Sequence, residues 1–175
     1  EVIGVDGLDD DRVRLVCRDE AGESTLTARY VAGVDGAHGI TAQLLDAAGR
    51  RTLQRSYPAS WLGVLVAAAP PSHELIYSRH PEGFALASMR APEVSRLYLQ
   101  VPAGDTLADW SEDRIWEQLH RRLDLPDSPV NEGRFLESSI TPLRSVVHRR
   151  MHYGRLLLGG DAAHLVPPTG AKGLN

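Results

Sequence analysis

Alternating apolar and polar residues predict a β-hairpin near the start of the chain. The alternation runs from Val13 to Arg18, stops at the turn-forming run Asp19-Glu20-Ala21-Gly22, and resumes from Ser24 to Val31. A period of two is typical of strands with one buried face. The glycine-rich run Gly33-Val34-Asp35-Gly36-Ala37-His38-Gly39 follows and predicts a tight turn that needs close backbone approach or positive φ. A short helix is expected over 40–45.

The middle of the chain predicts an antiparallel meander. Three strand-like runs cover 74–77, 84–89 and 96–101, with His80-Pro81-Glu82-Gly83 and Ala91-Pro92-Glu93 as turn signals between them. A second strand pair is expected over 134–140 and 143–148, and a last strand over 155–158.

One amphipathic helix is expected after the meander. It starts either at Ser111 or at Asp109, with Glu112 as the capping partner of Asp109, and it ends before Pro126. Its apolar face is formed by residues at helical spacing, namely Ile115, Trp116, Leu119 and Leu123. The predicted fold class is therefore a sheet-rich α+β arrangement.

Composition and charge narrow the classes of function. The chain has 175 residues, of which 42% are hydrophobic and 24% charged, and this is enough apolar material for a globular core. The net charge is −4 and the 19 Lys and Arg are scattered, which argues against nucleic acid or an anionic membrane as a partner. The apolar stretch Trp61 to Pro71 is interrupted by Gly63 and is too short to span a membrane.

The only cysteine, Cys17, excludes an internal disulfide and favours a reducing, cytoplasmic location. Cys17 itself is interpreted as a buried strand residue and not as a nucleophile. The chain opens without Met in a strand-like run and stops at Gly173-Leu174-Asn175, where a glycine-rich turn leads into a helix. We therefore expect a piece of a longer protein.

Two glycine-containing motifs near the end carry candidate chemistry. Leu156-Leu157-Leu158-Gly159-Gly160-Asp161 places a carboxylate at the end of a buried strand, where open α/β sheets bind ligands. An N-cap for the next turn is an equally good interpretation of Asp161. The following run, Pro167-Pro168-Thr169-Gly170-Ala171-Lys172-Gly173, exposes backbone N–H groups that suit an anion or a polarised carbonyl oxygen, or it is simply a loop.

Together these motifs resemble the single-component FAD-dependent aromatic hydroxylases. Gly160 to His164 with Pro167, Pro168, Gly170 and Gly173 to Asn175 is similar to the second flavin-binding signature of that family, and Tyr30 to Ile40 is similar to its Asp-Gly signature. The run from His73 to Pro102 resembles members that act on 4-hydroxybenzoate. The resemblance implies a substrate-binding domain with helices on one face, flanked by pieces of a Rossmann-like FAD-binding domain.

The resemblance implies the following reaction. FAD is reduced by NADPH or NADH, reacts with O2 to give a C4a-hydroperoxide, and transfers oxygen to the ring to convert 4-hydroxybenzoate to 3,4-dihydroxybenzoate. Tyr77 would meet the phenolic oxygen and favour its phenolate form. Substrate binding is expected from Ser88, Arg90 and Tyr98 at the carboxylate, and from Tyr77, Met89, Pro168 and Thr169.

Further roles follow from the resemblance. FAD would be held by Asp161, Gly170, Gly173, Leu174 and Asn175, with Arg96 near the flavin. His38 and Arg144 match positions tied to NADPH, although Ala42 stands where an arginine often follows, which puts the choice between NADPH and NADH in doubt.

The expected domain organisation has three parts: 1–50 as the end of the first FAD-domain part, 51–150 as the substrate-binding domain, and 151–175 as the second FAD motif. No metal-ligand spacing is seen, and a homodimer is expected only from the resemblance. Two alternatives stay open. One is a related hydroxylase of another aromatic acid, and the other is a non-catalytic module that binds aromatic acids.

Overall fold

The computed structural model describes residues 1–47, 52–123, 126 and 128–168. The chain divides into two compact units. The first unit combines Glu1–Ser56 with Arg144–Asn175, and the second is Tyr57–Leu143. Strands β5 (Thr52–Ala67) and β9 (Arg134–His148) each contribute residues to both units.

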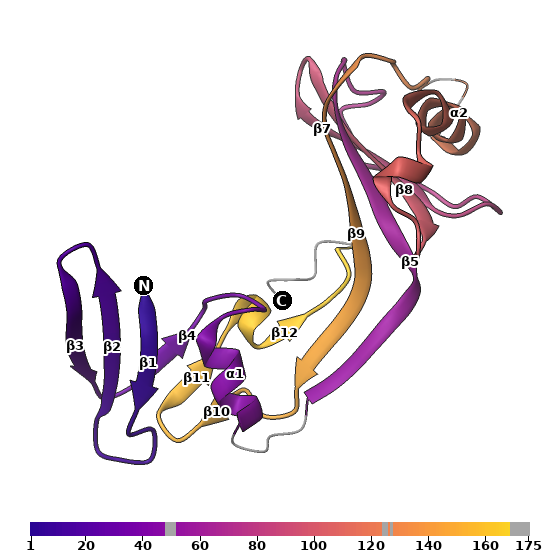
Figure 1. The fold of residues 1–175 in the computed structure, drawn as a ribbon. Helices are drawn as coiled ribbons and strands as arrows, with labels where there is room; N and C mark the ends of the chain where they lie inside the picture. Colours follow the sequence, from indigo (N-terminus) through magenta and orange to yellow (C-terminus); the bar gives the residue numbers. More distant parts are fainter. Residues whose placement is uncertain (48–51, 124–125, 127, 169–175) are drawn as a thin grey trace. The chain divides into compact units, whose positions relative to one another are not determined.

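The first unit contains an antiparallel sheet of β1 (Val2–Asp6), β2 (Val13–Asp19) and β3 (Gly22–Ala28). Strands β2 and β3 pair from Val13 opposite Ala28 to Asp19 opposite Gly22. The hairpin predicted from the alternating pattern is thus confirmed (Figure 1). Cys17 lies in β2 as expected, but it is half-buried and not buried.

A second small sheet of the same unit joins segments far apart in the sequence. Its strands are β4 (Val31–Gly33), β10 (His152–Tyr153) and β11 (Leu156–Leu158), in the order β10-β11-β4. Strands β11 and β4 run parallel. Helix α1 (Ile40–Ala47) contacts β1 and β11, so the predicted helix after the glycine-rich turn is confirmed. The buried residues at the centre of this unit are Val5, Val13, Val31 and Leu156.

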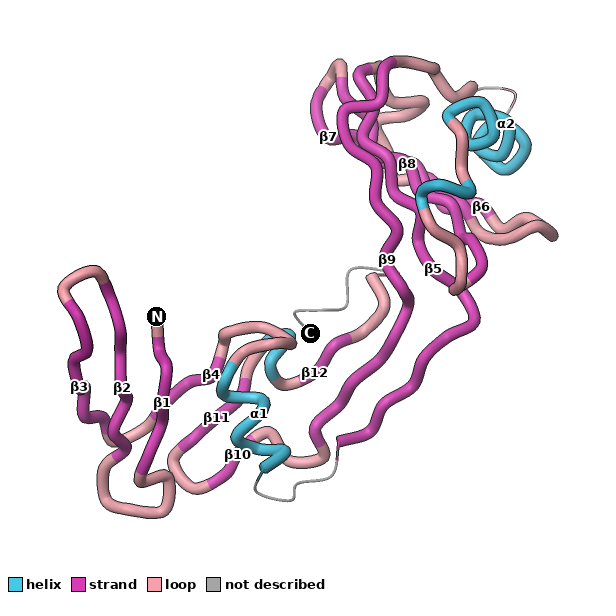
Figure 2. The backbone as a smooth tube through the Cα atoms, viewed as in Figure 1, coloured by secondary structure: helices cyan, strands magenta, loops and turns pink. Residues whose placement is uncertain are grey.

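The third sheet has the strand order β12-β9-β5-β8-β7-β6. Here β6 (Ile76–Ser78), β7 (Ala85–Ala91) and β8 (Val94–Pro102) form the predicted antiparallel meander, and β12 is a short strand at His164–Leu165. Figure 2 shows how strands dominate the backbone. The sheet-rich α+β prediction is confirmed.

Helix α2 (Glu112–Leu123) covers one face of the meander. Ser111 caps its start, since the Ser111 hydroxyl accepts a hydrogen bond from the Arg114 N–H at 3.3 Å. Of the two predicted starts, Ser111 is confirmed and Asp109 is wrong. The Asp109 carboxylate instead pairs with the N–H of Thr106, which precedes a short 3₁₀ helix at Leu107–Asp109.

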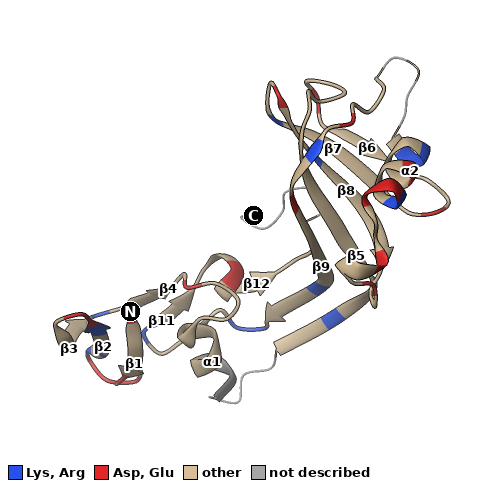
Figure 3. Cartoon of the chain, turned by 45° about the horizontal axis from the view of Figure 1, so that its top comes forward, with Lys and Arg blue, Asp and Glu red and all other residues tan. Residues whose placement is uncertain are grey.

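Charge along α2 complements the helix dipole. Acidic residues stand in its first turn and basic residues in its last, as the red and blue segments in Figure 3 show. Its apolar side contributes Ile115, Leu119 and Leu123 to the core, where they meet the strand residues Leu62, Val64, Val66, Ala85, Ala87, Leu97, Leu99 and Val101. Across the described residues, no helix is both long and apolar enough to cross a membrane.

Two predictions about strands need correction. The expected pair over 134–140 and 143–148 is one continuous strand, β9. The strand runs through Pro142, where the sequence had suggested a break between two strands, because proline lacks the N–H donor of a strand residue. Strand β5 had no strand prediction at all, because residues 59–64 are all buried and alternation is lost.

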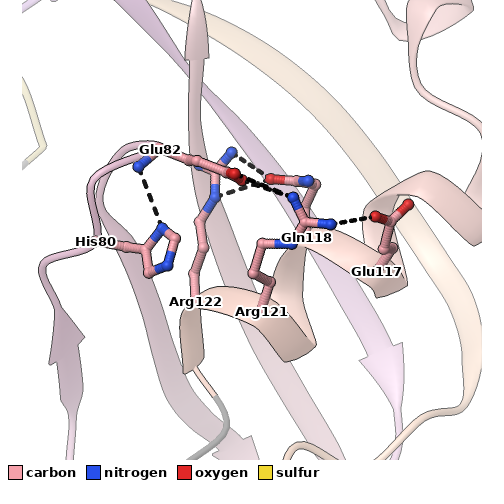
Figure 4. Close-up of polar contacts among 6 residues, drawn as sticks. All are labelled: His80, Glu82, Glu117, Gln118, Arg121 and Arg122. Atoms are coloured by element: carbon pink, nitrogen blue, oxygen red, sulfur yellow. Dashed lines mark hydrogen bonds and ion pairs between the residues drawn. The ribbon is translucent and has the colours of Figure 1, made fainter.

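A buried arginine near the end of α2, Arg122, connects this helix to strand β8. Figure 4 shows its contacts to Gln118 of the same helix. Arg122 is 7% exposed and donates from Nη1 to the Gln100 carbonyl oxygen at 2.9 Å and from Nε and Nη2 to Gln118 Oε1 at 3.1 and 2.6 Å. Its own carbonyl accepts a hydrogen bond from the Ser78 hydroxyl. Burial lowers the pKa of Arg122 below its ordinary value, so these polar contacts are needed to keep the cation in place.

We predict that Arg122→Ala destabilises the protein by about 2 kcal/mol or more, because the Gln100 carbonyl loses a charged donor in a buried setting. The neighbouring Arg121 contacts Glu82 and Glu117 with a side chain that is 44% exposed. The matched control Arg121→Ala should therefore cost less than about 1 kcal/mol. Denaturant unfolding of both variants measures the free energy of unfolding. Equal losses in the two variants would contradict the stabilising role given to Arg122.

Candidate substrate and cofactor sites

The face of the meander opposite α2 carries several of the predicted substrate residues. In the register of the sheet, Tyr77 lies opposite Leu86, Leu86 opposite Tyr98, and Tyr98 opposite Gly63. Residues directly opposite each other share a face. Ser88 lies opposite Arg96 in the same way, so Ser88 and Tyr98 share one face as the sequence predicted, and Tyr77 joins them.

Four aromatic rings come together in this region. The ring centroids of Trp61 and Phe84 are 5.3 Å apart, those of Tyr77 and Phe84 are 5.5 Å apart, and those of Trp61 and Tyr98 are 5.6 Å apart. Trp61 is a core residue and is only 4% exposed. Edge-to-face and tilted contacts of this kind hold rings in defined orientations. The cluster forms an apolar surface beside Ser88 and Arg96 on the same face of the sheet.

The polar end of the face is built around Arg96. Its Nη1 donates to the Tyr98 hydroxyl oxygen at 3.4 Å, its Nη2 lies 3.8 Å from a Glu137 carboxylate oxygen, and its carbonyl oxygen accepts from the Ser88 hydroxyl at 3.4 Å. A hollow of about 20 Å³ lies beside Arg96 and Tyr98, which is room for about one water molecule.

The predicted carboxylate-binding arginine lies at the end of this region. Arg90 and its neighbour Met89 are exposed, next to the two-residue turn that joins β7 and β8. The strand register shifts between Met89 and Ala91. Simple alternation from Ser88 therefore does not determine where the Arg90 side chain points, and its role stays a prediction.

The Asp-Gly segment of the first unit forms a tight turn at the carboxyl end of β4. Gly36 has a φ of 81°, and a Cβ atom on Gly39 would collide with the Asp35 carboxylate, so both alternatives expected for this turn occur. The Asp35 carboxylate accepts hydrogen bonds from the Thr41 N–H at 3.0 Å and from the Thr41 hydroxyl. Desolvation opposes ionisation, but these Thr41 donors hold the pKa of Asp35 below its ordinary value.

The second flavin motif begins at the carboxyl end of β11. Asp161 lies inside a 3₁₀ helix, Gly160–Ala162, whose N-cap is Gly159, so the alternative interpretation of Asp161 as an N-cap is wrong. The Gly159 N–H donates to the Gly33 carbonyl at 2.9 Å, which joins the ends of the parallel strands β11 and β4. The Asp161 side chain is exposed there. An exposed carboxylate at the carboxyl ends of adjacent parallel strands fits the ribose or ribityl hydroxyls of a dinucleotide.

The two residues predicted to bind NADPH contact each other. Arg144 Nη2 lies 3.1 Å from His38 Nε2, and both side chains are exposed. Pro168 is exposed at the end of the described chain. The remaining predicted residues, Thr169, Gly170, Gly173, Leu174 and Asn175, lie outside the described residues.

Sequence reasoning assigned no role in the site to Gly63, Phe84 or Glu137. Gly63 was noted only as a break in an apolar stretch, and Phe84 only as a strand residue. Glu137 carried no signal, because its pairing with Arg96 joins strands whose register the sequence does not reveal. These residues became visible from the cross-strand neighbours alone.

Comparison with known proteins identifies the class. The profile described as "FAD binding domain" matches residues 6–175. The chain therefore belongs to this FAD-binding family, and its predicted resemblance to FAD-dependent aromatic hydroxylases is confirmed.

Named relatives include the p-hydroxybenzoate hydroxylase of Acinetobacter baylyi, 49% identical over 83% of this chain and 36% of the relative. The aklavinone 12-hydroxylase DnrF of Streptomyces peucetius subsp. caesius is 28% identical over 95% of the chain and 35% of the relative. The chain thus spans about a third of the length of these two relatives.

Solved structures share the fold. The p-nitrophenol 4-monooxygenase PnpA of Pseudomonas putida superimposes with a TM-score of 0.78 at 22% identity, over 99% of this chain and 44% of the other. The flavin-dependent halogenase CmlS superimposes with a TM-score of 0.75 at 18% identity, over 99% of this chain and 32% of the other. At such identities the likeness shows the fold alone.

We predict that Asp35→Asn destabilises the fold near neutral pH and not in strong acid. Because the pKa of folded Asp35 lies below its ordinary value of 3.8, its ionised form stabilises the fold above that value. This stabilisation is lost as the pH falls through the lower, folded-state pKa. Thermal unfolding of the unmodified protein and of Asp35→Asn, from neutral pH to strong acid, measures the difference in stability between them.

Thr41→Val, which removes the hydroxyl donor, should show the same pH-dependent loss as Asp35→Asn. A difference in stability between the unmodified protein and Asp35→Asn that stays constant from neutral pH to strong acid would contradict the role given to the Thr41 hydrogen bonds.

Proposed function

We propose that the chain is the central part of an FAD-dependent monooxygenase that converts 4-hydroxybenzoate to 3,4-dihydroxybenzoate. The observation that carries the proposal is the shared sheet face of Tyr77, Ser88 and Tyr98 beside a cluster of aromatic rings. A flat ring with a hydroxyl at one end and a carboxylate at the other suits such a surface. The identity of 49% to a p-hydroxybenzoate hydroxylase supports the same substrate.

The carboxylate end of the substrate would be held by hydroxyl and guanidinium donors. Tyr98 and Ser88 offer hydroxyl groups, and Arg90 offers a planar pair of N–H donors. Because Arg96 donates to the Tyr98 oxygen, the Tyr98 hydroxyl proton remains available for an anionic acceptor. The buried indole of Trp61 and the ring of Phe84 would exclude water from the aromatic part of the substrate.

The phenol end would meet Tyr77. A hydrogen bond between the Tyr77 oxygen and the substrate hydroxyl stabilises the phenolate form, which raises electron density at the neighbouring ring carbon. Tyr77 is 47% exposed in this chain, so its hydroxyl is accessible to such a group. Tyr77 is the proposed catalytic residue.

The cofactor would be held by the first unit. Asp161 and the segment with Gly170, Gly173, Leu174 and Asn175 are the proposed FAD-binding residues, and Arg96 is proposed to act near the flavin. When bound, FAD supplies the redox chemistry that activates O2 with electrons from NADPH or NADH. His38 and Arg144 are the proposed contacts for the nicotinamide nucleotide, and Pro168, Thr169 and Met89 the remaining substrate contacts.

A hydroxylase of another aromatic acid is the second candidate. The observation that favours it is the position of Arg90, which is exposed at a shift in strand register, so that its place along the face does not follow from that of Ser88. A carboxylate at a different ring position would then also find a partner. A cytoplasmic location, a homodimer and the role of an isolated chain as a binding module stay predictions.

The deciding experiment uses the protein that contains this chain, loaded with FAD. With 4-hydroxybenzoate, NADPH oxidation should rise strongly and yield one 3,4-dihydroxybenzoate per NADPH. In the balanced reaction 4-hydroxybenzoate, NADPH, H⁺ and O2 give 3,4-dihydroxybenzoate, NADP⁺ and H2O. Product is quantified by chromatography.

Stimulation that yields only hydrogen peroxide would show that 4-hydroxybenzoate binds without being the substrate, which favours another aromatic acid. Absence of stimulation with every hydroxybenzoate and aminobenzoate tested would reject the hydroxylase proposal.

A substitution tests the carboxylate assignment. Arg90→Ala should weaken 4-hydroxybenzoate binding by about 2 to 5 kcal/mol, since a charged partner of the carboxylate is removed. Arg14→Ala, at an exposed arginine of β2 with only a 4.0 Å ion pair, serves as the matched control and should bind normally. Unchanged affinity in Arg90→Ala would remove Arg90 from the site.

A further inference from the structure

A glycine lies where strand β5 is most deeply buried. Gly63 stands between Leu62 and Val64, which are 1% and 2% exposed. Glycine inside a strand is less favourable than alanine, because it loses more conformational freedom on folding and packs no side chain. Such a position calls for a steric reason.

The reason lies on the neighbouring strand. Gly63 is paired with Tyr98, whose ring occupies the space where a side chain at position 63 would stand. A Cβ atom on Gly63 would lie 2.7 Å from Tyr98 Cε1 and 3.1 Å from Tyr98 Cδ1. Both distances are shorter than ordinary carbon contacts, so either the ring or the strand would have to move.

The ring is the part that would move. Strand β5 is flanked by β8 and β9 in the sheet, and its hydrogen-bonded backbone resists displacement. The Tyr98 ring is held on its other sides by the edge of Trp61, at an interplanar angle of 67°, and by Arg96, which donates to its hydroxyl oxygen. A side chain at position 63 would push the ring away from these contacts.

We propose that Gly63 is a positioning residue for recognition of the substrate carboxylate. By leaving room for the Tyr98 ring against β5, Gly63 keeps the Tyr98 hydroxyl beside Arg96 and on the face that carries Ser88. A hydrogen bond from a hydroxyl to a carboxylate depends on the position of its oxygen within a few tenths of an ångström. The inference rests on the proposed function and gives Gly63 a role that acts through the position of Tyr98.

The test uses Gly63→Ala in the FAD-loaded protein that contains this chain. We expect 4-hydroxybenzoate to bind about 10- to 100-fold more weakly, the range for a lost hydrogen bond to a charged group. Gly104→Ala is the matched control, because a Cβ atom there meets nothing within 4 Å. The control should bind as tightly as the unmodified protein. Titration of the ligand against flavin absorbance gives the dissociation constants.

A double-mutant cycle separates positioning from a general loss of stability. Tyr98→Phe keeps the ring and removes the hydroxyl, so in this background Gly63→Ala has no hydroxyl to displace. The inference therefore expects Gly63→Ala to have little further effect on affinity in Tyr98→Phe. Losses that multiply, or a Gly63→Ala protein that binds normally, would overturn it.

If Gly63→Ala does not fold, a second variant still tests whether the constraint at Gly63 comes from Tyr98. Tyr98→Leu removes the ring that collides with the added Cβ atom, so the double variant Gly63→Ala/Tyr98→Leu should fold again. If the double variant also fails to fold, the constraint at Gly63 does not come from Tyr98 and the inference is wrong.

Binding of 4-hydroxybenzoate to the unmodified protein separates a failure of the proposed function from a failure of the role assigned to Gly63. If the unmodified protein does not bind 4-hydroxybenzoate, the proposed function fails and this inference fails with it. If the unmodified protein binds and Gly63→Ala binds equally well, the inference alone fails.

Discussion

The cross-strand register of β5, β8, β7 and β6 is the constraint on which the candidate substrate site depends. Strand β8 alternates strictly, with Ser95, Leu97, Leu99 and Val101 buried and Arg96, Tyr98 and Gln100 half-buried. The buried set packs beneath α2, and a slip of one residue would exchange the two faces. The same pairing that forms the core therefore brings Tyr77, Ser88 and Tyr98 onto the opposite face.

The first unit is organised around a different constraint, the parallel pairing of β4 with β11. Each strand is followed by glycines and an aspartate, so two carboxylates come to adjacent strand ends. The two carboxylates have different surroundings. Asp35 is bound by Thr41 and stabilises its own turn, whereas Asp161 is exposed. The structure thus assigns Asp35 to the fold and leaves Asp161 available for a ligand.

The fold and the site carry different information about chemistry. Monooxygenases and a halogenase share this fold at low sequence identity, so the fold does not decide the reaction. What argues for an aromatic acid is a particular set of side chains on one sheet face. Two features support that face: Arg122 connects α2 to the meander, and Gly63 leaves space for the Tyr98 ring.

The sequence by itself determined the elements whose signals are local. Alternation marked the hairpin and the meander, glycines marked the Asp35 turn, and helical spacing with Ser111 marked α2. The motifs at Asp35 and Asp161 were enough to indicate the family. Tertiary structure alone decided that β9 continues through Pro142, that β5 is a strand although residues 59–64 are all buried, and that Gly63 lies beneath the Tyr98 ring. Each of these depends on a neighbouring strand distant in sequence, and local pattern carries no information about which strand that is.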